Sequence, residues 1–386
     1  MANLFDYVSW RGDLDFDRIP FNPVDNLVFS QLSYLPMDGI VPGPGGRGAT
    51  SVSALARIYA ARRAPASRDV TVAMAASTLK AIGTAPRYED CEILGYASHT
   101  DPDAEKQFSA FCAVIGRERP SRRLLVVYRG TDTSIAGWKE DLNMSLVNSI
   151  PSQEEAVSYL EEAAGRLPYP LIVAGHSKGG NLAIYASAFC GKSVQRRIAE
   201  VYSNDAPGFH REVLRRKGYR EVCGRIRAFV PQSSFVGMLL EHDVAPRVVK
   251  STAAGLMQHD MRSWEVTRDD LVDGGELTPQ SRFIHSIVNE WIAKIGDERR
   301  QQFVEALYKI LLSSNAASFA DMGSDWPSSA AGIIGGLKNI DGPTKKLMGE
   351  IVGELFKTAR KNIIGQRRKN GGARDDEWTT DLFSEE

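Results

Sequence analysis

The chemistry that the sequence indicates most clearly is that of an activated serine. Ser177 stands in GHSKG (residues 175–179), which matches the pattern G-x-S-x-G. The apolar run LIVA (residues 171–174) leads directly into it, and a helical pattern follows. In such a strand-to-helix turn the serine is held exposed in a strained conformation, and the flanking glycines let the helix pack close to the strand. The pattern therefore predicts a nucleophile elbow with Ser177 as the nucleophile.

Two other interpretations of this segment are open. A glycine-rich turn can hold an incidental serine, and a helix start with glycines can bind a phosphate. The phosphate-binding patterns GxxxxGK[ST] and GxGxxG are absent from the sequence. The flanking strand and helix favour the nucleophile.

A nucleophilic serine needs a general base, and in this type of fold the chain order is serine, acid, histidine. His259 follows the last predicted strand, RVVKS (residues 247–251), and is the expected base. His242, just ahead of that strand, and His285, inside a predicted helix, are the alternatives. His242 and the elbow residue His176 are also candidates for lining the substrate pocket.

The acid that orients the histidine is expected to be Asp205. The usual position follows the predicted strand RIRAFV (residues 225–230), but the chain continues there with PQSS and no carboxylate. The preceding strand, AEVYSN (residues 199–204), ends directly at Asp205. Asp243 and Asp260, which adjoin the two candidate histidines, are the alternatives, and a turn-forming role is the other interpretation of Asp205.

The elements that must position these residues alternate between strand and helix. Continuous apolar runs, typical of strands buried on both faces, alternate with helical patterns through the middle of the chain. This alternation predicts an α/β-hydrolase fold, with a mainly parallel sheet and helices on both faces. The predicted strands are residues 92–97, 108–115, 124–128, 171–174, 199–203, 226–230 and 247–250.

Four regions follow from the pattern of the chain. Residues 1–85 are expected to form an N-terminal helical and loop segment packed on the core, and residues 86–295 the hydrolase core. Apolar stripes at helical spacing predict a C-terminal helical appendage over residues 296–365, and residues 366–386 are polar and expected to be disordered.

Two further segments resemble a known family. YRGTD (residues 128–132), followed by GWKEDL (residues 137–142), resembles the segment of class 3 (fungal-type) lipases in which a buried strand ends in an Arg-Gly-Thr/Ser turn. Together with GHSKGG, NDAPGF and QHDMRSW, it is similar to a bacterial family of lipase-like hydrolases of unknown function, over roughly residues 1 to 310.

The resemblance implies an oxyanion hole made by Thr131, which follows the Arg-Gly pair, and by the backbone N–H of Lys178. Asp132 is then expected near the pocket. The chain departs from the class 3 pattern at Ser234, near which those lipases carry their acid.

Composition narrows the classes of protein. A formal net charge of −1 argues against a general nucleic-acid surface, and no apolar run reaches the about 18 residues of a spanning helix. No secretory signal is visible, and four separated cysteines fit buried thiols in a reducing compartment, so a cytoplasmic location is expected. No metal site or other cofactor is predicted, and the oligomeric state is open.

The predicted function is that of a serine hydrolase that cleaves a carboxylic ester, in a small-molecule or lipid substrate, through an acyl-enzyme on Ser177. A thioesterase, an amidase or an acyltransferase would use the same machinery. A catalytically silent hydrolase fold that acts as a binding protein is the alternative of a different class.

Overall fold

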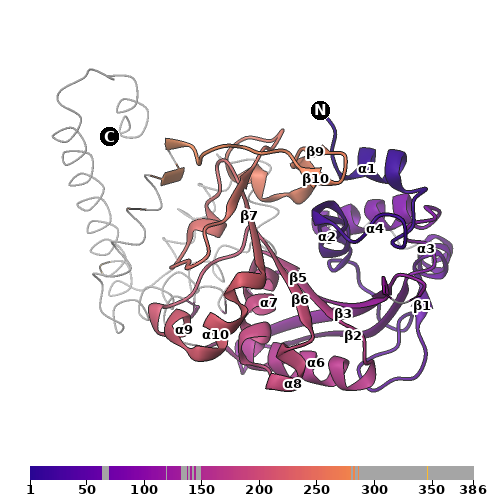
Figure 1. The fold of residues 1–386 in the computed structure, drawn as a ribbon, viewed down its shortest axis with the longest axis horizontal. Helices are drawn as coiled ribbons and strands as arrows, with labels where there is room; N and C mark the ends of the chain where they lie inside the picture. Colours follow the sequence, from indigo (N-terminus) through magenta and orange to yellow (C-terminus); the bar gives the residue numbers. More distant parts are fainter. Residues whose placement is uncertain are drawn as a thin grey trace.

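The protein is built on a central sheet whose strands lie side by side in sequence order. The structure, a computed structural model, describes residues 1–62, 69–118, 120–131 and 149–279, together with residues 137, 140, 143–144, 281–282, 286 and 346. Eight strands form the sheet (Figure 1). They are β1 (Thr50–Ser51), β2 (Glu92–Asp101), β3 (Lys106–Ile115), β4 (Arg123–Tyr128), β5 (Leu171–His176), β6 (Ile198–Asn204), β7 (Ile226–Pro231) and β8 (Arg247–Val249).

The pairing of the strands changes at β4. Strands β1 to β4 pair antiparallel, whereas β4 to β8 pair in parallel. Parallel neighbours need a crossover connection, and helices lie between β4 and β5, between β5 and β6, and between β6 and β7. The prediction of a mixed α/β architecture with a mainly parallel sheet is therefore confirmed.

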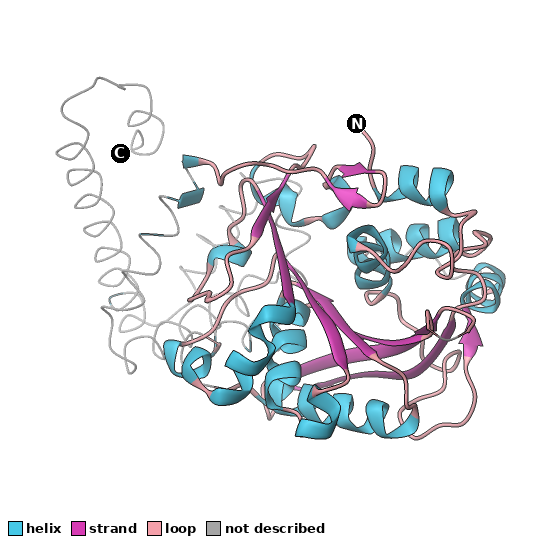
Figure 2. Ribbon diagram, in the orientation of Figure 1, coloured by secondary structure: helices cyan, strands magenta, loops and turns pink. Residues whose placement is uncertain are grey.

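The crossover helices cover one face of the sheet (Figure 2). They are α6 (Pro151–Arg166), α7 (Lys178–Phe189), α8 (Lys192–Gln195), α9 (Arg211–Arg215) and α10 (Lys217–Val222). Because the parallel strands follow one another in a single direction and such crossovers are right-handed, their helices must lie on the same face.

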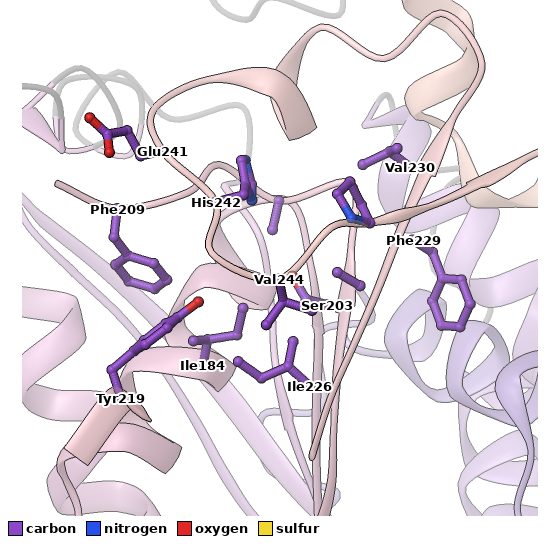
Figure 3. A pocket seen from close by; sticks show the side chains of 13 residues that line it. Ile184, Ser203, Phe209, Tyr219, Ile226, Phe229, Val230, Glu241, His242 and Val244 are labelled. Atoms are coloured by element: carbon purple, nitrogen blue, oxygen red, sulfur yellow. The ribbon is translucent and has the colours of Figure 1, made fainter. Parts of the chain in front are cut away.

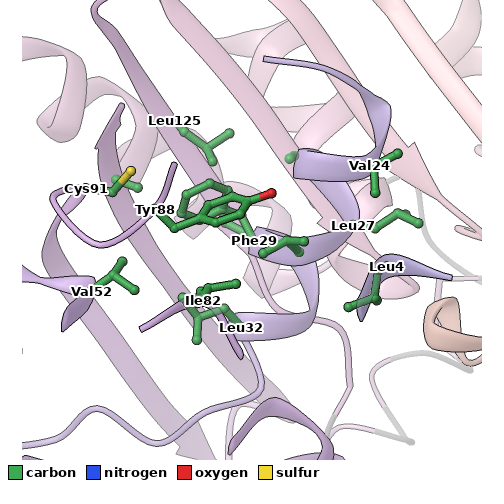
Figure 4. Close-up of a cluster of buried hydrophobic side chains, with 14 of the residues drawn as sticks. Leu4, Val24, Leu27, Phe29, Leu32, Val52, Ile82, Tyr88, Cys91 and Leu125 are labelled. Atoms are coloured by element: carbon green, nitrogen blue, oxygen red, sulfur yellow. The ribbon is translucent and has the colours of Figure 1, made fainter. Parts of the chain in front are cut away.

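The N-terminal segment covers the opposite face. Its helices are α1 (Leu4–Arg11), α2 (Pro23–Leu32), α3 (Val52–Ala61) and α4 (Val70–Ile82). Figure 4 shows Leu4, Leu27 and Phe29 of this segment gathered with Leu125 of β4 in one buried cluster. Helices thus lie on both faces, as predicted, but the second face is covered by the N-terminal helices and not by crossovers.

Strand β4 shows how the core divides between the two faces. Leu125 and Val127 pack with the N-terminal helices, whereas Leu124, Val126 and Tyr128 pack with the crossover helices. Successive side chains of a strand point to opposite faces, so a strand covered on both sides must be apolar throughout. The continuous apolar run predicted this burial correctly.

A buried arginine holds the N-terminal segment together. Arg87, 2% exposed, forms an ion pair with Asp25 of α2, and its guanidinium also donates to the carbonyls of Leu14, Ile19 and Pro20. A planar group with five donors can join several carbonyls to one carboxylate. Arg87 thereby fixes the position of α2, which contacts β5 and β6.

Short elements complete the described part of the chain. The 3-10 helix η1 (Cys223–Arg225) precedes β7, η2 (Val236–Met238) follows it, and η3 (Gly255–His259) and η4 (Met261–Ser263) follow β8. Strand β9 (Val266–Thr267) pairs with β10 (Asp270–Leu271). The predicted C-terminal helices (residues 296–365), the tail (residues 366–386) and His285 lie outside the described residues. Among the helices that are described, none is both long and apolar enough to cross a membrane.

Candidate active site

The turn between β5 and α7 places Ser177 in a strained backbone conformation. Strand β5 ends at His176, α7 begins at Lys178, and Ser177 between them has φ 56° and ψ −133°. A non-glycine residue rarely adopts a positive φ, and such strain persists only where the surrounding structure enforces it. A side chain at Gly175 would meet the carbonyl oxygen of Gly179 at 2.1 Å, which explains the need for glycine in the turn.

His259 and Asp205 meet at the carboxyl edge of the sheet. The Nδ1 atom of His259, at the end of η3, lies 2.7 Å from Oδ2 of Asp205, directly after β6. The Asp205 side chain is 1% exposed and that of His259 is 31% exposed. Because Nδ1 meets a buried carboxylate, Nε2 is the ring nitrogen that remains to take up a proton. The structure thus brings together the two residues that the sequence placed at separate strand ends.

Asp205 is itself held by several contacts. Its Oδ1 accepts hydrogen bonds from Oγ of Ser234, at 2.5 Å, and from the backbone N–H of Gly237, at 3.1 Å. Its own N–H donates to the carbonyl of Phe229, and its φ is 44°. A carboxylate fixed by two donors on one oxygen presents the other oxygen to the imidazole in a single orientation.

Ser177 adjoins this pair through the backbone. Its N–H donates to the carbonyl of Asn204, 2.9 Å away, and Asn204 directly precedes Asp205. The rings of His176 and His259 lie with their centroids 4.4 Å apart. No direct hydrogen bond joins Oγ of Ser177 to the His259 ring among the contacts of the described residues. In unliganded enzymes such bonds are often long and tighten only with substrate.

His176 holds the main chain that carries His259. Its Nε2 lies 2.9 Å from the backbone oxygen of His259, and its Nδ1 lies 2.7 Å from the hydroxyl of Tyr34. A carbonyl oxygen only accepts, so Nε2 carries the proton, and Nδ1 accepts from Tyr34. Burial, reinforced by the neighbouring His259, lowers the pKa of His176 to about 3, so this ring is neutral near pH 7.

Helix α2 supplies further contacts that the sequence did not predict. Nδ2 of Asn204 donates to Oδ1 of Asn26 at 3.0 Å, to Oγ of Ser30 at 3.2 Å and to the carbonyl of Gly175 at 3.0 Å. Polar residues at helical spacing in the predicted N-terminal helical segment were the available signal, because Asn26 and Ser30 lie four residues apart and share one face of a helix.

The two predicted oxyanion-hole residues flank the elbow. Lys178 is the first residue of α7, where backbone N–H groups and the helix dipole favour negative charge. Thr131 follows Gly130, which packs so closely that a side chain there would lie 2.7 Å from the His176 oxygen and 3.0 Å from Cβ of Ser177. Gly130 and Lys178 therefore both lie against Ser177.

The alternative acids lie elsewhere. Asp260 binds Arg262, with its Oδ2 2.8 Å from Nη2, and Asp243 is exposed. Neither carboxylate contacts His259, whose Nδ1 meets Asp205. Asp132 and His285 lie outside the described residues.

His242 lines a small pocket of the described structure. With Phe209, Tyr219 and Val244, it surrounds a water-sized space between β6, β7 and the crossover helices (Figure 3). Neither Ser177 nor His259 lines this space. An added Cβ at Gly208 would lie 3.0 Å from Nε2 of His242, so this side chain lies beside Gly208, and the expectation that His242 lines the substrate pocket stays a prediction. No group of three or more side chains suited to holding a metal ion occurs within the described ranges.

Comparison with known proteins shows the family to which the chain belongs. A model of the Mbeg1-like family matches residues 82–309, more than half of the 386 residues, so the chain belongs to the Mbeg1-like family. This membership supports the prediction of a lipase-like protein. The more specific relation to class 3 lipases stays a prediction. No curated protein matches the sequence. Among solved structures, the chain is similar to a Rhizomucor miehei lipase propeptide complex, with 18% identity, a TM-score of 0.36, and coverage of 59% of this chain and 67% of that one.

Proposed function

We propose that the protein is a serine hydrolase of the α/β-hydrolase type that cleaves carboxylic esters through an acyl-enzyme. Ser177 is the nucleophile, His259 the general base and Asp205 the acid that orients it. The observation that carries the proposal is the 2.7 Å contact between His259 and the buried Asp205, beside a serine held in a strained strand-to-helix turn.

The proposed reaction uses these three groups in turn. Oγ of Ser177 attacks the acyl carbonyl while Nε2 of His259 takes its proton, and Asp205 stabilises the imidazolium that results. The protonated His259 then gives the proton to the leaving alcohol. A water molecule, deprotonated by His259, attacks the acyl-enzyme, and collapse of the second tetrahedral intermediate releases the carboxylic acid and restores Ser177.

The negative charge that forms on the carbonyl oxygen needs donors already in place. We assign this role to the backbone N–H groups of Lys178 and Thr131. The support for Lys178 is its place at the N-terminus of α7, and the support for Thr131 is the tight packing of Gly130 against Ser177. A thioesterase, an amidase or an acyltransferase would need the same groups. We propose an ester as the substrate because the family is lipase-like.

A fluorophosphonate probe and a panel of acyl substrates test this function. We expect the probe to modify the wild-type protein at Ser177, located by peptide mass spectrometry, and to leave Ser177→Ala unmodified. Short p-nitrophenyl esters should be hydrolysed by the wild type and not by Ser177→Ala. Matched thioesters and anilides then separate the alternative substrates. Absence of labelling and of turnover on every substrate would instead support a silent hydrolase fold.

A further inference from the structure

The residue after the proposed nucleophile carries a fully buried charge that the mechanism above does not use. The ammonium of Lys178 lies 2.8 Å from Oε2 of Glu140, and the two side chains are 1% and 0% exposed. Removing two charges from water is costly, and buried ion pairs are often no more stabilising than apolar residues of equal size. Net stability is therefore a weak explanation for this pair, and a geometric role has to be considered.

The contacts of the pair form a closed cage. Nζ of Lys178 also donates to the backbone oxygen of Gln107 at 2.9 Å and to its side-chain Oε1 at 3.0 Å. Glu140 accepts in addition from the N–H of Gln107 at 3.1 Å and from the N–H of Ser152 at 3.0 Å. Three donors of the ammonium and both oxygens of the carboxylate are engaged, which fixes both side chains in one arrangement.

The cage joins four parts of the fold at one point. Gln107 belongs to β3, Ser152 to the first turn of α6, and Lys178 to the first turn of α7. Glu140 and Gly130 both follow β4 in the chain. Gly130 packs against His176 and Ser177, and Glu140 binds Lys178, so two residues that follow β4 contact the turn at Ser177 and the start of α7.

We propose that Lys178 and Glu140 are positioning residues for the oxyanion hole. Their ion pair ties Glu140 to the N-terminus of α7, beside the close approach of Gly130 to Ser177, and so sets the spacing between the backbone N–H groups of Thr131 and Lys178. The side chain of Lys178 is committed to the cage, and its backbone is its contribution to the site. This inference rests on the proposed hydrolase function.

The double variant Lys178→Met with Glu140→Gln tests the proposal. It removes both buried charges and nearly preserves volume, and the glutamine keeps one acceptor oxygen, which can serve the N–H group of either Gln107 or Ser152. We expect kcat on a short p-nitrophenyl ester to fall about 10- to 100-fold, because a small displacement of preformed donors weakens stabilisation of the transition state. KM should change less than about threefold, because these donors bind the oxyanion of the transition state more strongly than the carbonyl oxygen of the bound ester.

A second measurement separates positioning from plain stability. An alkyl trifluoromethyl ketone adds reversibly to the serine and forms an oxyanion, so its inhibition constant should rise in parallel with the fall in kcat. A purely structural pair would lower the melting temperature and leave both values unchanged in the folded protein. The control is the same pair of substitutions at an exposed ion pair, Lys192→Met with Glu221→Gln, whose side chains are 54% and 36% exposed.

The outcomes are distinct. A folded double variant with wild-type kcat and wild-type inhibition by the ketone overturns the positioning role and leaves the hydrolase function intact. If the double variant does not fold, Glu140→Asp keeps the charge and shortens the reach, and it should still lower kcat; unchanged kcat there also overturns the proposal. A wild-type protein that is neither labelled at Ser177 nor active overturns the hydrolase function, and this inference with it.

Discussion

Ser234 donates its hydroxyl hydrogen bond to Oδ1 of Asp205, across the carboxyl ends of two neighbouring strands. Asp205 follows β6, whereas Ser234 lies in the turn after β7. Ser234 therefore supports the Asp205 carboxylate from the turn after β7, and the other oxygen of that carboxylate meets His259. Residues that follow two neighbouring strands therefore position the His259 ring together, Asp205 directly and Ser234 through Asp205.

Replacement of Ser234 by alanine should weaken both the fold and the activity. The buried carboxylate loses one of the two donors on Oδ1, and a hydrogen bond to a charged group contributes about 1.5–3 kcal/mol. We expect the free energy of unfolding to fall by about 1–3 kcal/mol and kcat to fall about 10-fold. Urea denaturation and ester hydrolysis measure the two effects. Ser233→Ala is the control, because its hydroxyl makes only a 3.5 Å contact with Thr278; equal effects at both positions would contradict this role of Ser234.

The identity of the acid is tested by asparagine at two positions. Asp205→Asn should lower kcat by about 10³- to 10⁴-fold, because the amide no longer stabilises the imidazolium or fixes its tautomer. Asp260→Asn should stay within a few-fold of the wild type, since that carboxylate binds Arg262 and not the imidazole. Steady-state kinetics on one ester decides between the two. A large loss at Asp260 with little loss at Asp205 would show that the acid is assigned to the wrong residue.

Gly130 offers a test of how tightly the segment before Thr131 packs on the elbow. A Cβ at this position would lie 2.4 Å from the Tyr34 hydroxyl and 2.7 Å from the backbone oxygen of His176. Because the second contact is with backbone, Gly130→Ala must displace the chain, and we expect kcat to fall at least about 100-fold.

The matched control is Gly165→Ala in α6, where an added Cβ meets nothing within 4 Å. Alanine should stabilise this helix by about 0.5–1 kcal/mol and leave kcat unchanged. Thermal unfolding and ester hydrolysis of both variants provide the comparison. Wild-type activity in Gly130→Ala would show that the elbow does not require this close approach.

Much of the sheet could be predicted because its signal is local. The strand preceding Ser177 was expected over residues 171–174 and is observed at Leu171–His176, since a continuous apolar run between Pro170 and Gly175 indicates a short strand buried on both faces. His259 and Asp205 were selected by their places after strands, and strand ends on one edge of a parallel sheet converge in space.

The contacts that hold these residues could not be predicted in the same way. Tyr34 and His176 are 142 residues apart, and neither belongs to a periodic pattern that indicates a partner. The cage around Lys178 likewise depends on Glu140 and Gln107, whose polarity alone would place them at the surface. Position along the strands predicts which groups reach the edge, but polar pairing inside the fold is decided by three-dimensional packing.

The buried His176 gives the protein a specific dependence of stability on pH. Burial holds its pKa at about 3 in the folded chain, below the ordinary 6.5. Between these values the unfolded chain binds a proton that the folded chain does not, so His176 favours folding fully above pH 6.5 and progressively less as the pH falls toward 3. The slope is at most about 1.4 kcal/mol per pH unit.

His176→Gln removes the titrating group and keeps a side-chain N–H that can reach the carbonyl of His259. We therefore expect the loss of unfolding free energy between pH 6.5 and 4.5 to be smaller in this variant by about 2–3 kcal/mol, whatever its stability at pH 7. Urea denaturation at pH 7, 5.5 and 4.5 measures the slopes, and His99→Gln, at a ring 43% exposed, is the control. A slope in His176→Gln as steep as that of the wild type would mean that this ring is not the group that takes up the proton on unfolding.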